Sequence, residues 1–240
     1  MNAPRNRDVT NVYDNQIGFF SDPHGDFGSV KQVLRSGEVP AHSLFLGDFD
    51  LDRPLELELA ALIDAGSEVS WIPGNHDADR VEWHDFAFAS ALADRNISGR
   101  VIDIGGVKVA GLGGVFQADV WHPKDGNGKP KFATRADYMA ANQKKAWRDG
   151  LPLRHRATIF AEDFNALAGL EADVLISHEA PSSHKYGHQE IDDLAEVMGV
   201  KMIVHGHIHQ RYVATLANGI KVAGLEKAGY LMKTFEELLA

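Results

Sequence analysis

Six short apolar runs, each ending at polar residues or glycine, constrain the fold of this chain more than any other feature. They cover residues 17–21, 43–47, 69–73, 107–112, 173–177 and 201–205. Runs this short and rich in Val, Ile and Phe are typical of strands buried on both faces of a sheet. Helical patterns lie between several of them, at residues 28–35, 54–65, 137–147, 161–170 and 190–198. Strands that alternate with helices predict βαβ units and a largely parallel sheet.

The C-terminal part of the chain indicates a hairpin. Residues 211–216 and 220–225 read as strands, and Asn218-Gly219 between them is a strong turn signal. The sequence VKVAGL at 107–112 nearly repeats as IKVAGL at 220–225. The two copies are either paired strands of a second sheet or a chance repetition of strand-like residues. We expect two packed sheets with helices outside them.

Composition limits the chemistry and the partners. The 240 residues include no cysteine, which excludes disulfides, thiolate metal sites and thiol catalysis. Any metal must therefore be held by oxygen and imidazole ligands. The N-terminus is polar, and no run approaches the roughly 20 apolar residues of a membrane span. We expect a cytoplasmic protein without membrane contact, and the net charge of −10 argues against binding to long nucleic acids.

One segment, residues 117–157, differs from the rest of the chain in charge. It holds nine basic and four acidic residues, a balance of +5 in a chain whose total is −10. We interpret residues 1–240 as one domain with a basic insertion at about 117–157, which is either a lid over the site or a solvated charged face. Four aromatic residues among its cations suit either a nucleotide base or a small hydrophobic core, and they are Trp121, Phe132, Tyr138 and Trp147.

Side chains able to bind a metal follow five of the six apolar runs. In chain order they are Asp22, His24, Asp48, Asn75, His178, His207 and His209. Three of the intervals between these groups, 26, 27 and 29 residues, each match about one βα unit. Because the carboxyl ends of parallel strands meet at one edge of a sheet, we expect the side chains to converge there. Together they suffice for two divalent ions.

The blocks Asp-x-His, Gly-Asp, Gly-Asn-His-Asp, His and Gly-His-x-His occur in this order over residues 17 to about 225. In this they resemble the calcineurin-like metallophosphoesterases. The resemblance implies an α/β fold, a four-layer αββα sandwich of two mixed sheets with the metal site at the carboxyl ends of the strands. It also implies two ligand sets that share an aspartate: Asp22, His24, Asp48 and His209 for one ion, and Asp48, Asn75, His178 and His207 for the other. His205 is then a packed strand residue or a neighbour of the ligands.

The chemistry that the resemblance implies is hydrolysis of a phosphoester by a metal-bridging hydroxide. Two divalent ions lower the pKa of bound water and clamp the phosphoryl oxygens, and Asp48 bridges the ions. We expect Mn²⁺, with iron, zinc, nickel or cobalt as alternatives. His76 lies outside both ligand sets but follows Asn75 directly. The resemblance makes it a stabiliser of the transition state or the proton donor to the leaving alcohol, a role typically worth about 10²- to 10⁴-fold.

Contacts with the substrate are harder to assign. Arg53, His184 and Arg135 are candidates. Arg53 sits one position later than the arginine of the similar block in protein serine/threonine phosphatases, and Pro54 replaces the glycine of that block, which argues against protein phosphatase activity. The alternative role of Arg53 is a salt bridge at the start of a helix. Asp50 or Asp52 is a candidate to orient His76, or else a solvated helix cap.

We predict a metal-dependent phosphoesterase that hydrolyses phosphate monoesters or diesters. Its substrate would be a small anionic phosphoester, with nucleotides among the candidates. The alternatives are a nuclease or cyclic-nucleotide phosphodiesterase of the same superfamily, and a metal-bearing scaffold without catalytic activity.

Overall fold

The computed structural model describes residues 13–148 and 150–240 and shows two mixed β-sheets. The polar N-terminal residues 1–12 and Asp149, which belongs to the basic insertion, lie outside the described part. The smaller sheet has the strand order β10-β1-β2-β3. Its parallel strands are β1 (Gln16–Ser21), β2 (His42–Phe45) and β3 (Glu68–Trp71), and β10 (Gly229–Thr234) runs antiparallel to β1.

The larger sheet has the strand order β4-β5-β6-β7-β9-β8. Its four central strands are parallel: β5 (Val107–Leu112), β6 (Val174–Ser177), β7 (Met202–His205) and β9 (Lys221–Gly224). The two edge strands, β4 (Val101–Ile104) and β8 (Tyr212–Thr215), are antiparallel to their neighbours. Only β5 and β9 carry the repeated VKVAGL-like sequence. They lie in the same sheet but are separated by β6 and β7, so of the two alternatives left open for the repeat, pairing of the two copies with each other is wrong.

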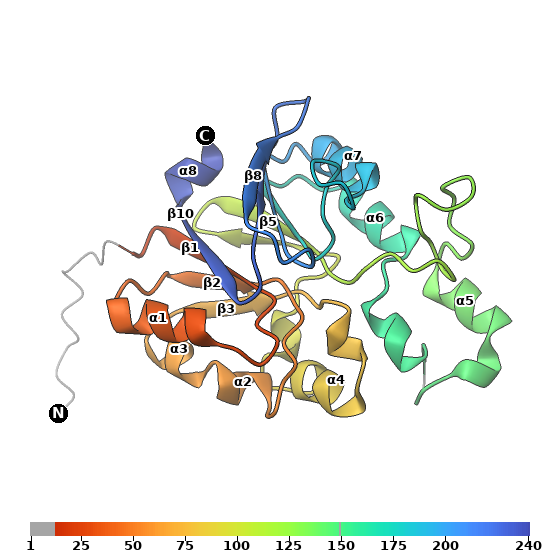
Figure 1. The fold of residues 1–240 in the computed structure, drawn as a ribbon, viewed down its shortest axis with the longest axis horizontal. Coiled ribbons are helices and arrows are strands. Elements are labelled where there is room, and N and C mark those ends of the chain that lie inside the picture. Colours follow the sequence, from red (N-terminus) through yellow and green to blue (C-terminus); the bar gives the residue numbers. More distant parts are fainter. Residues whose placement is uncertain (1–12, 149) are drawn as a thin grey trace.

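Alternation along the strands creates the four layers. Phe19 belongs to the apolar cluster between the two sheets, where it meets Val109 and Ile176, whereas its neighbour Phe20 faces the helices outside the smaller sheet. Those helices are α1 (Gly28–Ser36), α2 (Leu55–Glu58) and α3 (Ala60–Asp64). On the other side, α6 (Ala161–Ala168) and α7 (Gln189–Val197) cover the larger sheet (Figure 1). The predicted αββα arrangement is confirmed.

The basic insertion extends beside the two sheets, and much of it is green in Figure 1. It contains one α-helix, α5 (Arg135–Ala141), and its aromatic residues serve packing. Tyr138 is 1 % exposed and its ring centroid lies 5.2 Å from that of Phe132, while Trp121 packs against Phe164 of α6 at 5.0 Å. Of the two roles left open for the aromatic residues of the insertion, the structure therefore favours a hydrophobic core for Trp121, Phe132 and Tyr138.

Several element boundaries differ from expectation. The helix expected at 54–65 is interrupted at Leu59, whose backbone leaves helical geometry while its side chain stays in the core. The helix expected at 137–147 ends at Ala141, because the Asn142 side chain donates to the Tyr138 carbonyl at 2.9 Å and takes the place of a further helical turn. Besides β4 and β10, the short elements that were not expected include α4 (Val81–Phe88), α8 (Phe235–Leu239) and the 3₁₀ turn η1 (His76–Ala78). Within residues 13–148 and 150–240, no helix is long and apolar enough to cross a bilayer.

Candidate metal centre

The seven side chains predicted as ligands meet at one edge formed by the carboxyl ends of β1, β2, β3, β6 and β7. Among the described residues three groups form there, with the ligand atoms of each group within 4.8 Å of one another; one consists of His24, Asp50 and His76, and the other two consist of predicted ligands only. Of these two, the first contains Asp22, His24, Asp48 and His209, and the second contains Asp48, His178 and His207. Asn75 joins the second group, because its Oδ1 lies 3.2 Å from His178 Nε2.

Asp48 lies where the two groups meet. A single oxygen, Oδ2, is 3.7 Å from His24 Nε2 and 3.3 Å from His178 Nε2. The other oxygen, Oδ1, accepts a hydrogen bond of 2.8 Å from the backbone N–H of His76. One carboxylate oxygen is thus held in place by the backbone while the other faces both histidine groups.

The backbone at this edge is strained. Among the described residues, eight non-glycine residues have a positive φ angle, and six of them lie here: Asp22, His24, Asp48, Asp50, His207 and His209, with φ between 44° and 67°. Such left-handed conformations are uncommon outside glycine, and they persist only where the surrounding structure enforces them. This concentration of strain marks the edge as a functional site.

Buried hydrogen bonds hold the strained loops. Asp77, which is 1 % exposed, accepts backbone N–H groups from Asp48, Phe49 and Gly74 at 2.9, 2.8 and 2.7 Å. Its carboxylate therefore ties the loop after β2 to the loop after β3. Burial raises the pKa of Asp77 to about 7, and the negative charge of Asp48 adds to this effect. No role was predicted for Asp77 from the sequence, although the residue belongs to the Gly-Asn-His-Asp block.

Two glycines allow the loops to approach the carboxylates. A Cβ atom at Gly74 would clash with Asp48 and His178, and one at Gly206 would clash with Asp22 and Ser21. Asp22 itself is fully buried, and both of its oxygens accept from the His207 N–H at 3.0 Å. Ser21 Oγ also donates to it. Neither loop could hold its carboxylate this closely with a side chain at the glycine position.

Hydrogen bonds to the far side of two imidazoles set their orientation. His178 Nδ1 lies 2.7 Å from the Leu46 carbonyl oxygen, to which it donates, so Nε2 is the nitrogen that faces Asp48. His24 Nδ1 pairs in the same way with Asp50 Oδ2 at 3.0 Å. Such outer partners fix the tautomer of metal-binding histidines. His24 Nε2 then points at His209 Nε2 across 3.1 Å, where a cation would satisfy both nitrogens.

The electrostatic potential at this edge is negative. Burial raises the pKa of Asp22, but the hydrogen bond from His209 and the charge of His178 outweigh it, so the pKa is lower than usual. Burial alone would also lower the pKa of His178, yet the charge and hydrogen bond of Asp48, with help from Asp22, raise it to about 10. A pocket that attracts a proton this strongly, and is lined by oxygen and imidazole donors, fits divalent cations.

His76 lies beside the ligand groups and has a carboxylate partner of its own. Its Nδ1 is 3.0 Å from Asp79 Oδ2, and its ring meets that of His24 edge to face at 4.9 Å. The sequence suggested Asp50 or Asp52 as the residue that orients His76, but Asp79 makes this contact and Asp50 pairs with His24. The spacing of three residues within one turn of η1 is the signal that could have revealed Asp79.

The other predicted residues lie apart from the ligand atoms. His205 is fully buried in β7, with Nε2 2.8 Å from the Tyr212 hydroxyl. Arg53 is paired with Glu58 at 2.7 Å, as its alternative role requires. Arg135 pairs with Glu162 and Asp163 at 2.7 and 2.8 Å, and His184 contacts Gln210 at 3.2 Å. Substrate binding by Arg53, Arg135 and His184 stays a prediction, since the described residues that line the cavity beside the metal edge include none of them.

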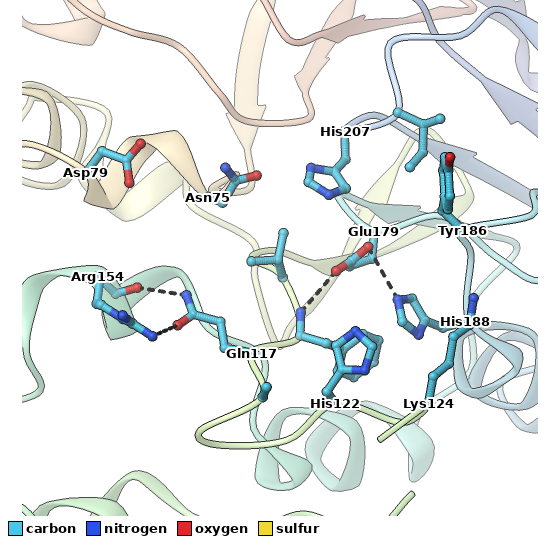
Figure 2. A pocket seen from close by; sticks show the side chains of 14 residues that line it. Asn75, Asp79, Gln117, His122, Lys124, Arg154, Glu179, Tyr186, His188 and His207 are labelled. Atoms are coloured by element: carbon cyan, nitrogen blue, oxygen red, sulfur yellow. Dashed lines mark hydrogen bonds and ion pairs between the residues drawn. The ribbon is translucent and has the colours of Figure 1, made fainter. Parts of the chain in front are cut away.

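That cavity has a volume of about 730 Å³ and borders Asn75 and His207 (Figure 2). Its walls come from four parts of the chain. The loop after β3 supplies Asn75 and Asp79, and the loop after β7 supplies His207 and Ile208. Val115 and Phe116 lie just before the basic insertion, which itself contributes Gln117, Ala118, His122, Lys124 and Arg154. Glu179, Tyr186 and His188 come from the loop after β6. A space of this size can hold a ligand as large as a nucleotide.

Comparison with known proteins agrees with this architecture. The chain is 36 % identical over 229 residues to an uncharacterized protein from Haemophilus influenzae, covering 92 % of this chain and 98 % of the relative. A dimetal phosphatase from Danio rerio has a similar fold, with a TM-score of 0.57 at 11 % identity over 91 % of this chain and 92 % of that one. The phosphopantetheinyl hydrolase of Mycobacterium tuberculosis has a TM-score of 0.53 at 15 % identity, over 89 % and 90 % of the two chains. Residues 16–211 match the family described as calcineurin-like phosphoesterase, and the chain belongs to that family.

Proposed function

We propose that this protein hydrolyses phosphate monoesters or diesters with a centre of two divalent metal ions. The observation that carries the proposal is the position of Asp48, whose Oδ2 lies between His24 and His178 and thereby joins the two ligand groups. Asp22, His24, Asp48 and His209 would hold one ion. Asp48, Asn75, His178 and His207 would hold the other. Mn²⁺ is our proposal for both ions.

The bound ions would supply a nucleophile from water at neutral pH and would polarise the phosphoryl oxygens. The protein's own contribution is to prepare the site. Hydrogen bonds to Asp22 and Asp48, and the carboxylate of Asp77, hold the loops in their strained shape before any substrate arrives. Preorganised groups of this kind need no rearrangement during the reaction.

His76 is proposed to assist departure of the leaving group. The contact between its Nδ1 and Asp79 leaves Nε2 as the nitrogen available to a substrate. An imidazole held in this way can donate a proton to the leaving alcohol, or a hydrogen bond to the developing charge. Asp79 is then a positioning residue, which acts through His76.

We also propose that the basic insertion forms part of the substrate site. Its residues Gln117, Lys124 and Arg154 line the cavity that borders Asn75 and His207, which supports a wall or lid rather than a solvated face alone. Small phosphoesters fit a space of this volume, whereas a long duplex does not suit a chain with a net charge of −10.

The test is hydrolysis of p-nitrophenyl phosphate and bis-p-nitrophenyl phosphate by metal-stripped protein resupplied with Mn²⁺. We expect activity only after metal is restored, with two ions bound per chain. Faster turnover of the diester would favour the phosphodiesterase alternative. Binding of two ions without hydrolysis of either compound, followed by no activity against a panel of phosphoesters, would favour the non-catalytic scaffold.

A further inference from the structure

We infer that the leaving group of the substrate carries a second anionic group, a phosphate or a carboxylate, and that Lys124 binds it. This inference rests on the proposed phosphoesterase function and specifies its substrate class. It comes from the wall of the cavity across from the metal edge. In Figure 2, Lys124, His122 and His188 lie together on one side, and Asn75 and His207 lie on the other.

The ion pairs around the cavity leave one charge uncompensated. Arg154 is engaged by Asp119 at 3.1 Å and by Gln117 at 3.2 Å, and Asp79 is paired with His76 at 3.0 Å. Lys124 has no such partner: within residues 13–148 and 150–240, no carboxylate lies within 4.0 Å of its Nζ. Among the described residues, its one polar contact is the carbonyl oxygen of Lys185 at 3.5 Å.

The acids close to this wall are engaged by other groups. Asp125 Oδ1 lies 3.4 Å from His122 Nδ1. Glu179 is 5 % exposed, its Oε1 accepts the backbone N–H of Phe116 at 3.0 Å, and its Oε2 lies 3.8 Å from His188 Nε2. An ammonium group that lines a cavity without an anionic partner in the protein is suited to an anion brought by the substrate.

One of the two histidines beside Lys124 offers a further hydrogen bond. His188 is only 4 % exposed, yet its Nδ1 is buried without a hydrogen-bond partner, whereas Nδ1 of His122 lies 3.4 Å from Asp125 Oδ1. The two rings meet edge to face at 5.3 Å. Buried polar atoms are seldom left unsatisfied, so the Nδ1 of His188 in a cavity wall points to a bound ligand or to ordered water. With Lys124, this imidazole forms a pair of donors for one anionic group.

The size of the cavity separates this pair of donors from the reacting phosphate. At about 730 Å³, the space holds more than a single phosphate group, and the pair of donors and the metal edge lie on different walls. A substrate that fills it must therefore extend from the reacting phosphate to a second charge. The substrate class that would contact both the metal edge and Lys124 is a phosphoester with an anionic leaving group.

Two matched pairs of substrates test the inference on the metal-loaded protein. The first pair is adenosine 3′,5′-bisphosphate and adenosine 3′-phosphate, which differ by a second phosphate. The second pair is 2-phosphoglycerate and glycerol 2-phosphate, which differ by a carboxylate. We expect kcat/KM to favour the doubly anionic member by about tenfold in at least one pair, the size of one charge-assisted hydrogen bond. Preference within the first pair alone identifies a phosphate, and preference within the second alone identifies a carboxylate.

The variant Lys124→Gln should reduce the ratio of kcat/KM between the doubly anionic substrate and its singly anionic counterpart towards one. Lys129→Gln is the matched control, because it removes the same charge from the same exposed loop at a residue that does not line the cavity, and it should keep the ratio. Circular dichroism would establish that both variants fold.

A wild-type ratio near one in both pairs, or a ratio unchanged by Lys124→Gln, would overturn the inference while the phosphoesterase function stands. A metal-loaded wild type that hydrolyses none of the four compounds and neither nitrophenyl ester would overturn the proposed function and the inference with it.

Discussion

In the smaller sheet, buried polar groups have different surroundings at the amino and carboxyl ends of the parallel strands. At the amino ends, His42 Nε2 meets Ser70 Oγ at 3.0 Å, and Ser43 Oγ meets Ser67 Oγ at 2.8 Å. At the carboxyl end of β1, His24 Nε2 faces Nε2 of His209, which follows β7 of the larger sheet, at 3.1 Å, and both residues have a positive φ. The amino ends complete their hydrogen bonds within ordinary strand geometry.

The difference separates structural polar groups from functional ones. Burial alone does not distinguish them, because His42 is 7 % exposed and Asp48 is 1 % exposed. What distinguishes them is that the groups at the carboxyl ends face one another from strained backbone, with lone pairs directed at a shared space. Changes at the carboxyl ends should therefore affect activity, and changes at the amino ends should affect stability alone.

The largest effect should follow from Asp48→Asn. This change keeps the hydrogen bond from His76 N–H but removes the charge shared by both ligand groups. We expect loss of both ions from the site, measured by metal analysis, and a fall in phosphoester hydrolysis of at least about 10⁴-fold. Asp52→Asn, an exposed change in the same loop, is the control and should keep both ions. Full metal content with near-normal turnover in Asp48→Asn would contradict the bridging role.

His76→Ala should have the next largest effect. His76 lies outside the two ligand groups, so the variant should retain two metal ions and lower kcat by about 10²- to 10³-fold, within the usual range of general-acid catalysis. The deficit should be smaller for p-nitrophenyl esters than for alkyl esters, because nitrophenolate leaves without protonation. A wild-type rate on alkyl esters would remove His76 from the reaction.

Asp79→Asn should have a smaller effect on the same step. Because Asp79 contacts His76 Nδ1, the variant should lower kcat by about tenfold, in the range for residues that orient a functional histidine. The double variant with His76→Ala should be no slower than His76→Ala alone, since Asp79 acts through that ring. If the two losses multiply instead, Asp79 has a separate role in the cavity.

At the amino end, His42 should affect stability and its dependence on pH without affecting hydrolysis. Burial lowers the pKa of His42 to about 4, while nearby Glu68 acts in the opposite direction and Arg95 in the same one. The folded state thus keeps the ring neutral where the unfolded chain would protonate it. The contribution of the neutral His42 ring to the free energy of unfolding is complete above pH 6.5. It is lost as the pH falls to about 4, and it amounts to about 3 kcal/mol in total.

The measurement is urea unfolding of metal-stripped wild type and His42→Gln between pH 4 and 7. The free energy of unfolding of the variant should fall less steeply with decreasing pH than that of the wild type. Parallel curves for the two proteins would show that His42 is not held neutral by the fold. Reduced turnover in metal-loaded His42→Gln would break the contrast between the two ends of the strands.

Prediction from the sequence succeeded where local pattern determines structure. The central strands are recognisable in the sequence as apolar runs. The polar residues that follow these runs, such as Asp48 and His178, lie at the predicted edge of the sheets. The strands β4 and β10 were missed because each is an edge strand whose place depends on a partner. For β10 this partner is β1, more than two hundred residues earlier in the chain.

The residues around the ligands were less predictable. Asp77 and Asp79 lie within a recognisable block, but only the folded backbone shows which N–H groups or which histidine each one contacts. In the basic insertion, composition alone did not distinguish Arg154, which is paired with Asp119, from Lys124, which lacks an acidic partner in the described structure. Such pairings depend on distances between residues far apart in sequence.

The pairing of β10 with β1 also sets the order in which the protein can mature. Ribosomes add about 5–20 residues per second, and domains generally fold as units during synthesis. The first three strands are made early, but β1 obtains its second neighbour only when residues 229–234 have left the ribosome exit tunnel. His207 and His209 also lie close to that end of the chain. A nascent chain thus presents Asp22 and Asp48 before these histidines are made, and the set of ligand side chains is complete only once residue 209 has been added.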